Sequence, residues 1–117
     1  MKLNIFFDRR AVGAALLLTA SLSLGCGAAV RNPALERAKD VYNRARQDRE
    51  VVARAAVALD RARLTLEQAE RVWSAEKDVV EVEHLAFVAE KRVEIARATA
   101  RRRLAADEIQ QLNPQRD

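Results

Sequence analysis

Among the residues of this 117-residue chain that could do chemistry, Cys26 stands apart because of the residues around it. It is the only cysteine, so the chain cannot form an internal disulfide. Apolar and small residues precede it, in the order Leu22-Ser23-Leu24-Gly25. A single thiol at such a boundary indicates covalent modification, and the alternative is an idle or buried thiol.

The residue types used in catalysis and metal binding are present without their usual spacing. His84 is the only histidine, and Glu81 is the one carboxylate that shares its helix face, so a surface histidine is favoured over a proton-transfer or ligand role. All three glycines lie within the first 27 residues, which excludes a glycine-rich phosphate loop in the rest of the chain. Carboxylates alternate with arginines at helical spacing, as in Glu67 and Arg71. We predict no catalytic residue, no metal ligand and no enzymatic activity.

The first 25 residues have the three parts of a secretory signal. Lys2, Arg9 and Arg10 supply a basic start, residues 11–24 carry no charge, and small residues surround Gly25. The uncharged run is short for a bilayer span of about 20 residues. It does continue to Val30, so an uncleaved anchor remains the alternative.

Residues 22–26 resemble the lipobox of bacterial lipoproteins, with Ser23 in place of the commoner leucine. The resemblance implies cleavage before Cys26, a diacylglycerol thioether on its sulfur and an acyl chain on its amine, and no other cofactor. Several such chains anchor a protein durably, whereas one gives only reversible binding. Residues 26–32 would then be the lipidated tether. By the same resemblance, Gly27 in place of Asp implies the outer membrane, facing the periplasm.

Composition and charge predict one all-α domain. Apolar residues make up 50% of the chain and aromatic residues only 4%, while glycine and proline together number five. Three of the 21 basic and one of the 17 acidic residues lie in the first 25, so the mature chain keeps 18 and 16. This near balance gives no reason to expect a nucleic-acid partner.

Apolar periodicity predicts helices over about 33–48, 52–75 and 79–112, followed by a disordered tail over 113–117. Asn32-Pro33 marks the first start, and Asp78 with Glu81 resembles a capping box at the last. Between the first two helices the apolar stripe slips in phase near Arg49, which predicts a kink or tight connection over 48–51 or one continuous bent helix. The three predicted stripes are Leu35, Ala38, Tyr42, Ala45; then Val52, Ala55, Leu59, Ala62, Leu66, Ala69, Trp73; then Val82, Leu85, Ala86, Ala89, Val93, Ala96, Ala100, Leu104.

These stripes predict an antiparallel helical hairpin or a three-helix bundle with coiled-coil-like, alanine-rich seams. Alanine lets helices approach closely but buries little apolar area, so an isolated monomer would be marginal. We therefore expect a homo-oligomer or a partner helix.

The run from Glu83 to Ala98 resembles a family of bacterial envelope lipoproteins that carry an alanine-rich helical domain of unknown function. The resemblance covers roughly residues 33–108 and includes Leu85, Ala86, Ala89 and Ala96, which periodicity also places on the last stripe. Its members often have an OmpA-like peptidoglycan-binding domain downstream, and residues 33–108 would not themselves supply its activity. The resemblance therefore implies a fold and a location and no activity.

Two features could form an interaction surface. Trp73 falls in the seam register, where burial is the ordinary expectation and docking of a partner is the alternative. The last helix is rich in basic residues, namely Lys91, Arg92, Arg97, Arg101, Arg102 and Arg103. We predict a lipid-anchored structural or protein-interaction role in the envelope, with binding of peptidoglycan or anionic lipid through this basic helix as the alternative.

Overall fold

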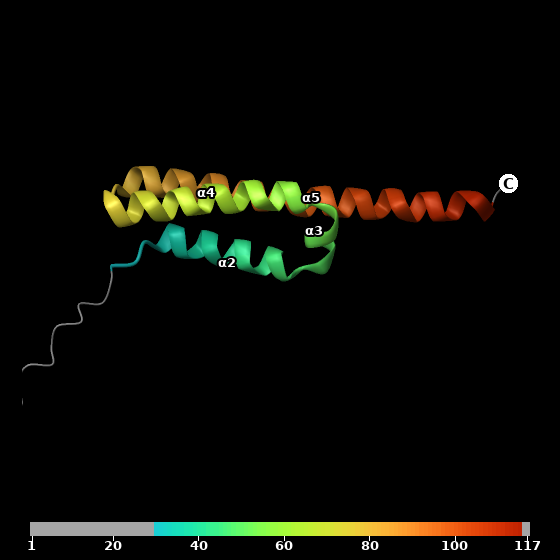
Figure 1. Cartoon of the computed structure of the whole chain (residues 1–117), viewed down its shortest axis with the longest axis horizontal. Coiled ribbons are helices and arrows are strands. Elements are labelled where there is room, and N and C mark those ends of the chain that lie inside the picture. The colour runs from blue at the N-terminus through green and yellow to red at the C-terminus, as the bar shows by residue number, and fades with distance from the viewer. Residues whose placement is uncertain (1–29, 116–117) are drawn as a thin grey trace, which may run out of the picture. The chain divides into compact units, whose positions relative to one another are not determined.

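The computed structural model describes residues 30–115, and within them it is all-α with no strand (Figure 1). The predicted all-α class is therefore confirmed. The predicted signal, Cys26 and most of the predicted tether lie outside the described residues. The helices are α2 (Pro33–Gln47), α3 (Arg49–Arg54), α4 (Ala56–Ala75) and α5 (Val79–Leu112).

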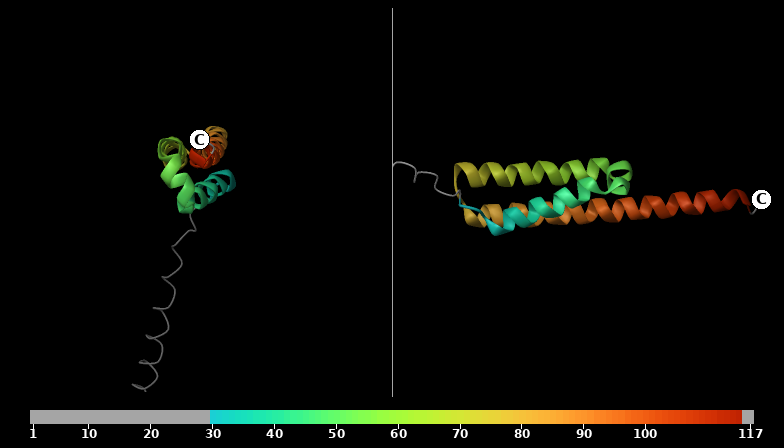
Figure 2. Two further views of the ribbon diagram at one scale, coloured as in Figure 1. Left: turned by 90° about the vertical axis from the view of Figure 1, so that its right-hand side faces the viewer. Right: turned by 90° about the horizontal axis from the view of Figure 1, so that it is seen from below.

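The three longer helices form a bundle, and α3 connects α2 to α4 at one end of it (Figures 1 and 2). The chain runs along α2, returns along α4 and reverses again into α5, so α4 is antiparallel to both of its neighbours. Helix α2 packs against both α4 and α5. Of the two predicted architectures, the three-helix bundle is the one observed.

Side-chain caps explain where three of the helices begin. The Asn32 Oδ1 accepts a hydrogen bond from the Leu35 N–H at 3.0 Å, and the Asp78 Oδ1 accepts one from the Glu81 N–H at 3.0 Å. Asp48 caps α3 in the same way. Each cap pairs an amide that has no partner inside its helix. The reversal between α4 and α5 also needs a left-handed backbone at Lys77, whose φ is 55°.

The connection between α2 and α4 contains two breaks, whereas one was predicted. Asp48 leaves helical geometry (φ −78°, ψ 112°), as the phase slip in the sequence suggested. The chain breaks again at Ala55 (φ −135°, ψ 32°), so the predicted helix over 52–75 is wrong as a single helix. The second break lets α3 turn across the end of the bundle and bury both Val51 and Ala55.

The core has two parts along the bundle axis. The part nearer the α4–α5 turn contains Leu35, Ala38, Leu66, Ala69, Val82, Leu85, Ala86 and Ala89. The part nearer α3 contains Ala45, Val51, Ala55, Leu59, Ala62, Val93, Ala96 and Ala100. The predicted stripes account for nearly all of these residues. The exception is in α3, where Val51 is buried and the predicted Val52 is exposed, because the break at Asp48 rotates α3 relative to the extrapolated stripe.

Helix α5 is longer than the helices it packs against and projects past α3 (Figure 2). We call residues 101–112 the overhang. Its only partly buried side chains are those of Leu104 and Asp107. The helix is followed by a 3-10 turn, Asn113–Gln115, which lies within the tail predicted over 113–117. Pro114 can sit in this turn because a tight i→i+3 turn uses few backbone donors.

Candidate interaction surface

Trp73 lies near the end of α4 and is partly buried against the core nearer the α4–α5 turn. The Lys77 Nζ sits 4.8 Å from the centre of its ring, within the range of a cation–π contact. The indole therefore packs against the core and also contacts the ammonium group of Lys77. The side chain is placed by packing, as its seam position indicated.

Arg92 fastens α5 to α4. Its Nη1 donates to the Thr65 Oγ1 at 2.5 Å and to the Arg61 carbonyl oxygen at 3.3 Å. The Thr65 hydroxyl is buried and itself donates to the Arg61 carbonyl at 3.1 Å. Arg92 thus supplies the donor that this buried oxygen needs. It is an internal link and contributes little free charge to a partner surface.

Arg103 and Asp107 join the overhang to α3. The Arg103 Nη1 donates to the Arg54 carbonyl oxygen, which lies next to the backbone break at Ala55. The Arg54 guanidinium forms ion pairs with Asp107 and with Glu50, the latter with an N–O distance of 2.6 Å. These carboxylates raise the pKa of Arg54, chiefly through hydrogen bonds from its guanidinium to Glu50 and Asp107. The group stays charged and keeps the base of the overhang attached.

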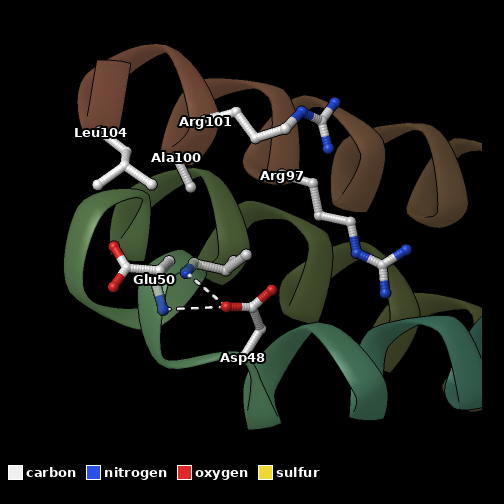
Figure 3. Close-up of a pocket in the computed structure, with 7 residues that line it drawn as sticks. Asp48, Glu50, Arg97, Ala100, Arg101 and Leu104 are labelled. Atoms are coloured by element: carbon white, nitrogen blue, oxygen red, sulfur yellow. Dashed lines mark hydrogen bonds between the residues drawn. The ribbon is translucent and has the colours of Figure 1, made fainter. Parts of the chain in front are cut away.

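The other basic residues predicted for the surface make no hydrogen bond or ion pair to α3 or α4 among the described residues 30–115. Lys91 pairs with Glu94 on its own helix at 3.0 Å. Arg97 and Arg101 leave α5 one turn apart and line a hollow of about 240 Å³ that faces the start of α3 (Figure 3). Arg102 is exposed on another side of the helix. The six basic residues therefore do not form one common surface, because successive residues on a helix turn by about 100°.

The two carboxylates that line the hollow beside Arg97 already have partners within the fold. The Asp48 Oδ1 already accepts hydrogen bonds from the Glu50 and Val51 amides, at 2.9 and 3.4 Å (Figure 3). The Glu50 carboxylate is paired with Arg54. Both carboxylates are thus committed to the connection between α2 and α4, so the hollow is a feature of the fold and no reactive pair lines it.

A second stripe on α5, apolar except for Arg102, is not among the stripes predicted from the sequence. We call it the outer stripe, and its positions are Ile95, Ala98, Arg102, Ala105, Ile109 and Leu112. Ile95, Ile109 and Leu112 are 59%, 60% and 61% exposed. The signal that would have found it is the same alternation of three and four that located the buried stripe, on the opposite side of the helix.

Within residues 30–115, no three histidine, cysteine or acidic side chains are placed to hold a metal ion. The imidazole of His84 is exposed. No helix in this described part of the chain is both long and apolar enough to cross a membrane.

Lys39 of α2 links this helix to α4 through an ion pair with Glu70. Its Nζ lies 3.1 Å from a carboxylate oxygen of Glu70 and 3.4 Å from one of Glu36. Partial burial lowers the pKa of Lys39, but the hydrogen bond and charge of Glu70, helped by Glu36, outweigh it and hold the pKa above 10.5. This side of the bundle is therefore closed by charge pairs, whereas the outer stripe has no such cover.

A three-helix bundle with one projecting helix is the class that these features define. The family model for a domain of unknown function, DUF4398, matches residues 33–112, which spans α2 through α5. The chain belongs to this family. No curated protein matched the chain. No solved structure matched it either.

Proposed function

We propose that this protein is a lipid-anchored component of the bacterial cell envelope with a structural or protein-interaction role and no catalytic activity. The bundle acts as a rigid support, and α5 is the helix that it presents to a partner. The observation that carries this proposal is the projection of α5 past the bundle with Ile109 and Leu112 exposed. Exposed apolar side chains arranged on one helix face are typical of docking surfaces.

The location rests on the residues around Cys26. A basic start, an uncharged run and Leu22-Ser23-Leu24-Gly25-Cys26 support export and lipidation of the thiol. Gly27 after the cysteine, in place of Asp, supports transport to the outer membrane, where the protein would face the periplasm. The company of OmpA-like domains among similar lipoproteins supports the same compartment.

Intact mass spectrometry of chain extracted from membranes tests the anchor. The expected mass corresponds to a chain that starts at Cys26 and carries a diacylglycerol and an acyl group. A Cys26→Ser variant is the control and should retain the first 25 residues. A wild-type mass that also retains them, without lipid, would overturn the anchor.

A photo-crosslinking side chain placed on α5 tests the interaction role in intact envelopes. At Ile109, on the outer stripe, it should give a discrete crosslinked species. At Val80, which is 79% exposed on the same helix but outside the stripe, it should give none. Equal labelling from the two positions would contradict a docking role for the overhang.

Binding of peptidoglycan or anionic lipid through the basic residues is the competing function. Arg92 and Arg103 are committed to contacts within the bundle, which leaves Arg97, Arg101 and Arg102 to supply the charge. Co-sedimentation with peptidoglycan or anionic vesicles distinguishes it, since retention by this route must fall with added salt. Retention that a triple change of these arginines to glutamine abolishes would favour the competing function.

A further inference from the structure

The outer stripe runs along the side of α5 that faces away from the bundle core. Its members recur at alternating steps of three and four residues from Ile95 to Leu112. Val93, Ala96 and Ala100 of the buried stripe lie about half a turn away from it, because each residue advances about 100° around the helix. Helix α5 is thus apolar on two opposite sides, and the fold covers one of them.

The spacing of the outer stripe is that of a coiled-coil seam. Ile95, Arg102 and Ile109 take one heptad position, and Ala98, Ala105 and Leu112 take the other. We propose that the partner of α5 is a second copy of this chain, paired antiparallel along residues 95–112. This inference rests on the interaction role proposed above and names its partner.

The side chains of the stripe fit an antiparallel pair in one register. Ile95 meets Leu112 of the second copy, and Ala98 meets Ile109 of the second copy. Arg102 meets the small Ala105, which leaves space for its aliphatic stem while its charged end reaches water. The two-fold symmetry repeats each of these contacts, so every large residue faces an apolar neighbour. A two-fold contact of this kind closes on itself and gives a dimer.

Charge supports the same orientation. Arg101 and Glu108 flank the stripe, and neither forms an ion pair among the described residues 30–115. In the antiparallel register Arg101 lies opposite Glu108 of the second copy, and symmetry makes the pair twice. A parallel pair would instead stack Arg102 on its own copy and leave both flanking charges without partners.

The bundle leaves room for the second copy. Helices α2 and α4 cover the buried stripe, and a hollow of about 310 Å³ between α4 and α5 borders Ile95. Val57, at the rim of this hollow, is 70% exposed. Leu112 of the second copy would end beside Ile95 and Val57, which share the lining of this hollow with Arg61, Arg102 and Arg103. Burial of the outer stripe also supplies the apolar area that alanine-rich seams lack.

Sedimentation of the full chain in mild detergent tests the pairing. The wild type should form a dimer, and Ile109→Glu should weaken it about 100-fold, since each copy loses the burial of one isoleucine, worth about tenfold. Val80→Glu makes the same change at an exposed site outside the stripe and should leave the dimer intact. Circular dichroism should show both variants fully helical. A wild-type monomer at every accessible concentration would overturn the inference.

Charge exchange tests the register. Arg101→Glu should weaken the dimer by placing two carboxylates against each other. The double variant with Glu108→Arg should restore it, because the pair is remade with opposite polarity. Failure of the double variant to recover would sink this register.

Cysteine crosslinking tests the orientation. Two tagged variants, Ile95→Cys and Leu112→Cys, should crosslink to each other when coexpressed and should not crosslink alone. In the antiparallel pair the two copies of residue 112 lie about 25 Å apart along the axis. The chain without an added cysteine controls for Cys26. Self-crosslinking of either variant alone would contradict the antiparallel pair.

These outcomes separate the two proposals. A monomeric wild type whose Ile109 position still crosslinks to a different envelope protein would remove the self-pairing and leave the interaction role standing. Loss of the Ile109 crosslink together with a monomeric chain would remove both.

Discussion

The first two-thirds of α5 and its overhang are one continuous helix in two different environments. Residues 79–100 contribute seven buried side chains to the core. Residues 101–112 contribute none, although Leu104 and Asp107 are partly covered. The helix nevertheless continues without a break to Leu112.

The difference shows how far local preference can extend a helix that packing has started. Nucleation is the costly step in helix formation, and the bundle has already met that cost for α5. The overhang needs only propagation, and it is composed of good helix formers such as arginine, leucine, alanine and glutamine. Packing therefore stabilises the first region, whereas propensity and the contacts of Arg103 and Asp107 maintain the second.

The largest difference in stability is expected when a charge is placed on the buried side of α5 in one variant and on its exposed side in another. Val93 is fully buried, so Val93→Asp should cost more than about 4 kcal/mol and unfold the bundle. Ile95→Asp, two residues along on the outer stripe, should change monomer stability by no more than about 0.5 kcal/mol. Urea denaturation followed by circular dichroism measures both. Similar losses from the two changes would mean that the outer stripe is covered within the monomer.

A smaller effect is expected from filling the alanine seam. Ala89 is 1% exposed, so Ala89→Leu should force α5 away from its neighbours at a cost of about 1–3 kcal/mol. Ala98→Leu adds the same atoms on the exposed side and should leave the stability of the monomer unchanged, when measured at concentrations too low for pairing. Thermal unfolding of the two variants measures this difference. An unchanged unfolding midpoint for Ala89→Leu would show that the alanine seam has room for a larger side chain.

The overhang should respond to glycine locally. Ala105→Gly lowers helix propensity by about 1 kcal/mol in a region without buried side chains. At concentrations too low for pairing, amide hydrogen exchange should speed up in residues 105–112 while the global unfolding midpoint of the monomer stays constant. Ala100→Gly, at the last buried position of the stripe, should lower the global midpoint instead. A global loss from Ala105→Gly would make the overhang part of the cooperative core.

The smallest effect is expected from raising the pH, which removes the charge that Lys39 places beside Glu70 between α2 and α4. The folded-state pKa of Lys39 is raised above 10.5, so its stabilising contribution is present below that pH and is lost as the pH rises through the raised value. The contribution should be below about 1 kcal/mol, because the pair is partly solvated. Stability of wild type and Lys39→Met, compared at pH 9 and above pH 11, measures it. The gap between the two should narrow with rising pH, and a widening gap would contradict the sign.

Much of this fold follows from local pattern. The stripes on α2 and α5 identify their buried faces, and Asn32 and Asp78 mark two helix starts through hydrogen bonds to residues three positions along. Such signals can be recognised in the sequence because the residues that interact lie within one helical turn of each other. The break at Ala55 has no such signal, since neither glycine nor proline stands there. It exists because α3 must cross the end of the bundle, which depends on helices that are distant in the sequence.

The candidate surface was less predictable than the fold. Composition grouped six basic residues on the last helix, but Arg92 and Arg103 turn out to donate to groups in α4 and α3. Their acceptors, Thr65 and the Arg54 carbonyl, are 27 and 49 positions away in sequence. No local pattern reports such pairings. The prediction of lipidation at Cys26 stays a prediction, because that residue lies outside the described part of the chain.

The sequence by itself determined that this protein is helical, which faces of its helices are apolar and where two of the four helices begin, because periodicity and capping act over a few residues. Only the tertiary structure decided which of the two apolar sides of α5 is buried, where α3 breaks away from α4 and which arginines remain available. Those outcomes depend on which helices meet. A stripe becomes a core only when another helix packs against it, and on α5 the bundle does so for one of the two.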